Sequence, residues 1–73
     1  MKKEKPQCQQ IFVTNLRSIR NQKGLSQVQL AKKLSISFVH LNNIENGKNF
    51  PSTQLLDKIC EALQITMKDL FEE

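Results

Sequence analysis

The hydrophobic residues of the chain recur every three or four positions in short runs, and turn-forming residues separate these runs. The first run consists of Phe12, Leu16 and Ile19 and stops at Gly24. This spacing puts the apolar side chains on one face of an α-helix, and glycine is common just after a helix end. The pattern predicts an amphipathic helix that starts near Gln9.

A second helix follows at once. Ser26 and Gln29 have the spacing of a capping box, in which each side chain satisfies a backbone N–H group of the other residue. Leu30, Ala31 and Leu34 then form the apolar stripe of this helix.

A connection of only two residues leads to Ser37, a suitable N-cap for a third helix over residues 37–45. Leu41 and Ile44 face inward, and the Asn-Gly pair at 46–47 ends the helix.

Two more helices complete the pattern. Ser52 is a suitable N-cap for the fourth helix, and Thr66 with Asp69 forms a capping box for a short fifth helix. Their inward residues are Leu55, Leu56, Ile59, Cys60, Leu63, Met67, Leu70 and Phe71. The sequence therefore predicts a compact, all-α domain of five helices over residues 9–73, preceded by a flexible basic tail over residues 1–8.

Size and charge restrict the function. The chain has 73 residues, with 11 Lys or Arg against 7 Asp or Glu, and a formal net charge of +4. A domain of this size buries only about 60% of its unfolded surface, which leaves no room for a catalytic domain or a small-molecule effector domain. A basic surface attracts polyanions such as nucleic acid.

Chemistry-bearing residues are sparse. Cys8, Cys60 and His40 lack metal-ligand spacing, and no nucleophile, acid–base pair or phosphate loop suggests an enzyme, so we expect neither metal nor cofactor. We expect no signal peptide, because the charged start is not followed by an apolar segment, and no apolar run approaches the roughly 18 residues of a membrane span. We expect a cytoplasmic, nucleoid-associated protein with reduced thiols and no membrane partner.

The outward face of the third helix is unusual. At about 100° per residue, Val39, Asn42, Asn43 and Asn46 point away from the inward side. A solvated helix face usually carries Lys and Glu, and Asn is a poor helix former. In the DNA major groove, however, amides can bond adenine and apolar groups can contact the thymine methyl. This face is therefore predicted to contact DNA; the alternative is that Asn46 only helps to end the helix and that Asn42 and Asn43 are solvated.

The stretch from 24 to 48 reads GLSQVQLAKKLSISFVHLNNIENGK. It resembles the helix-turn-helix of phage-repressor and Cro-type transcriptional regulators, and the resemblance extends from Phe12 to Phe71. It implies a lambda-repressor-like domain that binds a pseudo-palindromic operator in double-stranded DNA as a homodimer. Such a protein acts as a repressor or controller of transcription, with its third helix in the major groove.

The resemblance also assigns roles to residues. The base-reading residues would be Ser37, Phe38, Val39, Asn42 and Asn43. The phosphate-contacting residues would be Gln27, Asn46, Lys48 and Asn49. Arg20 and Glu45 would form a structural ion pair that orients the third helix. In two places the chain departs from the family, because Ser35 and Gln64 stand where glycine is frequent.

Several assignments have alternatives. Phe50, Met67, Leu70 and Phe71 are candidate dimer contacts, but the same residues could simply close the core. Phe38 could pack on the scaffold, and His40 could pack or face a phosphate. A competing function is an antitoxin-like interaction module that binds a protein partner through an apolar patch; its residues would be Ile11, Val13 and Val28.

Overall fold

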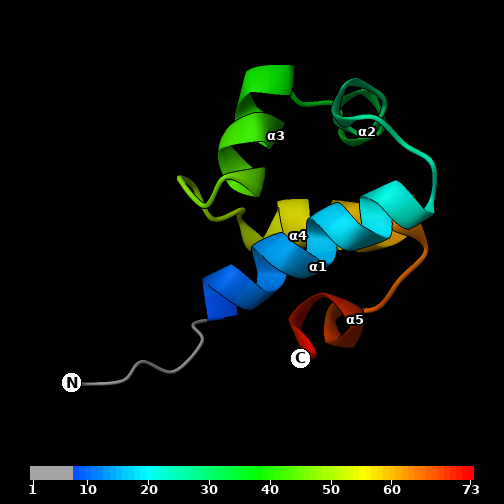
Figure 1. Cartoon of the computed structure of the whole chain (residues 1–73). Helices are drawn as coiled ribbons and strands as arrows, with labels where there is room; N and C mark the ends of the chain where they lie inside the picture. The colour runs from blue at the N-terminus through cyan, green and yellow to red at the C-terminus, as the bar shows by residue number, and fades with distance from the viewer. Residues whose placement is uncertain (1–7) are drawn as a thin grey trace.

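The computed structural model describes residues 8–73, which form five α-helices (Figure 1). The helices are α1 (Cys8–Gln22), α2 (Gln27–Leu34), α3 (Phe38–Glu45), α4 (Thr53–Leu63) and α5 (Met67–Phe71). The predicted all-α architecture of five helices is confirmed.

The predicted basic tail meets the described structure at a single residue. Cys8, which the sequence assigns to the tail, is the first described residue of α1. Residues 1–7 lie outside the described part of the chain, so the tail and its boundary stay a prediction.

The helices pack around one core. α1 contacts α3 and α5, α2 contacts α3 and α4, and α4 contacts α5. In Figure 1, α2 and α3 lie above α1, and α5 lies below it. The buried apolar residues are Phe12, Leu16, Leu30, Ala31, Leu34, Leu41, Ile44, Leu55, Leu56, Ile59, Leu63 and Leu70. The inward stripes predicted from the spacing therefore supply this core.

The four predicted N-caps are all present. The side chains of Ser26, Ser37, Ser52 and Thr66 each accept a hydrogen bond from the backbone N–H three residues later, at 3.0 to 3.3 Å. The capping boxes at Ser26 and Thr66 are complete. Local polar residues thus fix where α2 to α5 begin.

The first four helices end in the same way. At each end two backbone N–H groups bond back to the last turn, in the double-bond pattern of a Schellman motif. A residue one or two positions after the helix has a positive φ in every case: Gly24 (73°), Ser35 (58°), Gly47 (78°) and Gln64 (58°). Two of these four positions therefore lack the glycine that adopts this conformation without strain.

We expect Ser35→Gly to raise the free energy of unfolding by roughly 0.5–1 kcal/mol, because it removes the left-handed strain of a residue with a Cβ atom. Urea denaturation followed by circular dichroism measures the change.

The matched control is Ser18→Gly, the same replacement at an exposed position within α1. This control should lower stability by about 0.5 kcal/mol, because glycine is unfavourable inside a helix. Destabilisation by both replacements would contradict the strain at Ser35.

Candidate nucleic-acid interface

The exposed face of α3 carries two apolar side chains. Phe38 and Val39 are 46% and 64% exposed, and neither belongs to the buried core. Ser37 is exposed as the N-cap, and Asn42 and Asn43 are half-buried on the next turn. Phe38, Val39, Asn42 and Asn43 therefore form one strip along α3, and Ser37 is exposed just before the first residue of the helix.

The amide groups on this strip have no structural task within residues 8–73. No side-chain hydrogen bond of this region involves the amide of Asn42 or Asn43. Asn15 behaves differently, because its amide donates to the carbonyl groups of Leu70 and Glu72 at 2.9 and 2.8 Å. The two α3 amides keep their hydrogen-bonding capacity for a ligand.

A buried ion pair fixes the position of α3. Glu45, in the last turn of α3, is only 1% exposed. Arg20 of α1 donates two hydrogen bonds to its carboxylate, from Nε to Oε2 at 2.8 Å and from Nη2 to Oε1 at 3.1 Å. The Nη1 group of Arg20 also donates to the carbonyl of Leu25 at 2.8 Å. The ion pair that the resemblance assigns to these two residues is present.

Gln27 completes this cluster. Its side-chain amide donates to Oε1 of Glu45 at 2.9 Å, so part of the group assigned to phosphate contact is used inside the protein. The first backbone N–H groups of α2 have no intrahelical partner, and Ser26 satisfies only that of Gln29. Sequence reasoning missed the bond between Gln27 and Glu45, because 18 positions separate the two residues and no local pattern connects them.

The loop after α3 projects a lysine. The N–H groups of Lys48 and Asn49 bond back to the carbonyl of Asn43 at 2.9 and 3.4 Å, and both residues are exposed. Gln9 of α1 donates to the carbonyl of Gly47 at 2.9 Å and so holds the loop from the other side. Lys48, Asn49 and the exposed Asn46 are therefore presented by a constrained backbone.

The charge of this region is one-sided. Between Arg17 and Lys48 the only acidic residue is Glu45, which is buried against Arg20. The surface of α2, α3 and their flanking loops is consequently neutral or positive, which suits contact with a polyanion.

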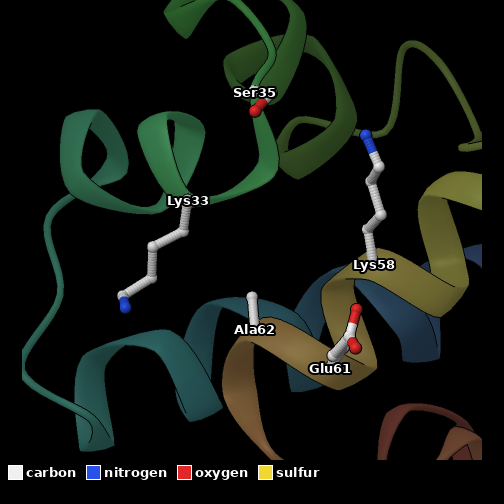
Figure 2. Close-up of a pocket in the computed structure, with 5 residues that line it drawn as sticks. All are labelled: Lys33, Ser35, Lys58, Glu61 and Ala62. Atoms are coloured by element: carbon white, nitrogen blue, oxygen red, sulfur yellow. The ribbon is translucent and has the colours of Figure 1, made fainter.

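The surface also has shallow hollows. A hollow of about 310 Å³ between the turn after α2 and α4 is lined by Lys33, Ser35, Lys58, Glu61 and Ala62. In Figure 2, Lys33 and Lys58 come from facing elements and extend in different directions, so their amines do not converge on one point. His40 is exposed and lines a neighbouring hollow of about 240 Å³ with Ser52, Gln54 and Lys58.

Reactive and metal-binding features are few. Burial, followed by the negative charges of Asp57 and Asp69, raises the pKa of the Cys60 thiol, which favours the neutral form. Within residues 8–73, His, Cys, Asp and Glu side chains do not gather in groups of three or more that could hold a metal ion. No helix in the same part of the chain combines the length and apolar character needed to cross a bilayer.

The candidate dimer contacts divide into two kinds. Leu70 is 0% exposed and belongs to the core, so the structure removes it from the interface candidates. Met67 and Phe71 are half-buried against the core. Phe50 is 48% exposed and lies 5.2 and 6.3 Å, between ring centroids, from Phe12 and Phe71. Phe50 therefore keeps the most surface for a partner.

The expected protein-binding patch is also smaller than predicted. Val13 packs against the core, and Ile11 is half-buried beside a hollow that includes Glu73. Val28 remains 51% exposed on α2.

Two capped helices joined by a tight turn, with an exposed polar and apolar strip on the second helix, define a helix-turn-helix domain. The profile of the helix-turn-helix family HTH_3 matches residues 16–70. The chain belongs to this family of DNA-binding transcriptional regulators.

Similar proteins include regulators of several kinds. The control protein C.MunI of a Mycoplasma species is 35% identical over 63 residues, which cover 85% of both chains. The antitoxin PezA of Streptococcus pneumoniae serotype 4 is 34% identical over 81% of this chain. The crystal structure of the restriction-modification controller protein C.AhdI from Aeromonas hydrophila has a TM-score of 0.79, with 33% identity over 84% of this chain and 92% of that one.

The matches differ in extent. The chain spans 37% of the length of PezA, and 57% and 44% of two other curated relatives. The part that these proteins share with this chain is the helix-turn-helix domain.

We expect Arg20→Met to lower the free energy of unfolding by roughly 3–5 kcal/mol, because it leaves the buried carboxylate of Glu45 without its charged partner. Urea denaturation of the purified variant measures the loss.

Lys68→Met provides the control, since Lys68 and Glu72 form an exposed pair at 4.0 Å. Lys68→Met should lower the free energy of unfolding by less than about 1 kcal/mol. The double replacement of Arg20 by Met and Glu45 by Leu should recover most of the stability lost in Arg20→Met. Equal losses for Arg20→Met and Lys68→Met would show that the buried pair is not needed for stability.

Proposed function

We propose that this protein binds a pseudo-palindromic operator in double-stranded DNA as a homodimer and regulates transcription as a repressor or controller. In this function α3 lies in the major groove, and Ser37, Phe38, Val39, Asn42 and Asn43 contact base edges.

The observation that carries this proposal is the exposed strip of α3. Its apolar side chains lie outside the core, and its amides are not engaged within residues 8–73. Donor and acceptor groups placed beside apolar groups match the base edges of the major groove, which display hydrogen-bonding atoms and the thymine methyl. A strip that served only solubility would have no need for Phe38 and Val39.

Contacts to the phosphates would flank this strip. The free N–H groups at the start of α2, with Gln27, are suited to one backbone strand. The exposed residues Asn46, Lys48 and Asn49 are suited to a second stretch of backbone. The absence of any exposed acid between Arg17 and Lys48 removes repulsion from this surface.

Dimerisation follows from the limited reach of one domain. An eight-residue helix contacts only a few base pairs, and each mismatched pair costs about 1–3 kcal/mol. Two half-sites would therefore be needed for useful specificity. The exposed side of Phe50, with the partly buried Met67 and Phe71, is the surface we assign to the second copy.

A second candidate function is that of an antitoxin-type protein with a protein partner. It is supported by the similarity to PezA and by the exposed Val28. Complex formation on co-expression with the product of an adjacent gene, with Val28 protected from solvent in that complex, would favour this function.

Selection of bound duplexes from a random pool tests the main proposal. We expect enrichment of one pseudo-palindromic sequence, with half-site centres about 34–36 Å apart on one face of the duplex. Failure to enrich any sequence at moderate salt would contradict sequence-specific binding, and enrichment of single half-sites would contradict binding as a dimer.

Asn43→Ala should weaken binding to the selected duplex by about 1–3 kcal/mol and leave binding to random DNA nearly unchanged, because the amide reads a base.

Lys48→Gln should instead weaken binding to all duplexes and reduce the slope of log affinity against log salt by about one. Fluorescence anisotropy at several salt concentrations measures both effects.

Gln10→Ala is the matched control for the amide, since Gln10 is exposed on α1 beside the C-terminal Glu73. It should alter neither affinity nor slope. Equal loss of specific and random binding in Asn43→Ala would remove Asn43 from base reading.

A further inference from the structure

Phe38 and Val39 are unusual among the exposed hydrophobic residues of the protein. Within residues 8–73, the large exposed hydrophobic residues are Val28, Phe38, Val39 and Phe50. Phe50 lies against Phe12 and Phe71, so its ring contributes to the fold. Phe38 and Val39 are adjacent in the first turn of α3 and remain 46% and 64% exposed. Their exposed surface is the largest apolar feature on the proposed reading face.

Each of these two side chains has an amide beside it. At about 100° per residue along α3, Val39 projects between Asn42 and Asn43, and Phe38 projects beside Asn42. An apolar group that contacts DNA here would therefore lie next to bases read by amides. The surrounding segment exposes no acid, which suits a polyanion such as DNA and disfavours a basic protein surface as the occupant.

Only one apolar group is available on base edges in the major groove. It is the methyl group on C5 of thymine. The same methyl at the same position distinguishes 5-methylcytosine from cytosine. Thymine and 5-methylcytosine differ at ring position 4, where one has an acceptor oxygen and the other a donor amino group. Phenyl and isopropyl side chains have neither donors nor acceptors, so they cannot sense this difference.

We propose that Phe38 and Val39 read the C5-methyl group of a pyrimidine, so that thymine is preferred over uracil and 5-methylcytosine over unmethylated cytosine at the contacted position. This inference rests on the proposed function, since it requires α3 to lie in the major groove. It makes operator binding sensitive to cytosine methylation, in the direction of tighter binding to methylated DNA.

The experiment uses the duplex obtained by selection and varies single pyrimidines within each half-site. At each position four duplexes are compared, which carry thymine, uracil, 5-methylcytosine or cytosine with the matching partner base. At the contacted position we expect the protein to bind the thymine duplex more tightly than the uracil duplex. It should bind the 5-methylcytosine duplex more tightly than the cytosine duplex by the same factor. Burial of one methyl group corresponds to about a fourfold change.

Variants assign the effect to the two side chains. Val39→Ala and Phe38→Ala should reduce the methyl-dependent ratios towards one. Val28→Ala is the matched control, because Val28 is 51% exposed on α2 and lies outside the proposed strip. This control should keep both ratios. Circular dichroism verifies that each variant remains folded.

The possible outcomes distinguish failure of the proposed function from failure of methyl reading alone. Absence of any preferred duplex overturns the proposed function itself. If the protein binds specifically but its affinity ratios for thymine over uracil and for 5-methylcytosine over cytosine are near one at every pyrimidine, methyl reading alone is overturned. Methyl-dependent ratios that persist in both Phe38→Ala and Val39→Ala also overturn it, because the methyl groups would then act through the shape of the DNA. A thymine effect without a 5-methylcytosine effect at the same position shows that ring position 4 is read and contradicts the proposal.

Discussion

The buried carboxylate of Glu45 is the constraint on which the reading face depends. α3 has eight residues and contributes only Leu41 and Ile44 to the apolar core, too little to fix its rotation about its own axis. A helix this short is also unstable alone. The bonds from Arg20 and Gln27 anchor its last turn to α1 and to the start of α2. The same bonds neutralise the only acid of the segment, so one interaction both orients the strip and removes a charge that would repel phosphates.

The first four helices end in the same Schellman motif, but the motif after α3 differs from the others in the side chain that follows the left-handed residue. In a Schellman motif the residue directly after the left-handed position frequently makes an apolar contact. Leu25, Ile36 and Ile65 occupy the position after the left-handed residue in three of the motifs, and all three pack against the core. Lys48 occupies this position after α3 and is exposed. The stability of this end is thus left to the backbone bonds and to Gln9, and the side chain remains available for a ligand.

Sequence reasoning succeeded where the signals are local. Periodicity identified the core and the capping residues identified four helix starts, because both depend on residues within one or two turns. It failed where partners are distant: nothing near Gln27 indicates Glu45, and nothing near Asn15 indicates the end of α5. Leu70 was assigned to a possible interface because apolar spacing does not distinguish a core from a contact surface. The ion pair of Arg20 and Glu45 came from family resemblance and not from any pattern in the chain.

The contact between Asn15 and the end of α5 affects how the domain folds. A five-residue helix cannot persist by itself, and two of its terminal carbonyl groups are satisfied by a side chain 55 and 57 positions earlier. The first and last helices therefore complete each other, which requires closure of a loop of 55 to 57 residues. We expect that α5 does not fray independently and that amide exchange in α5 and in the middle of α1 occurs in one cooperative opening.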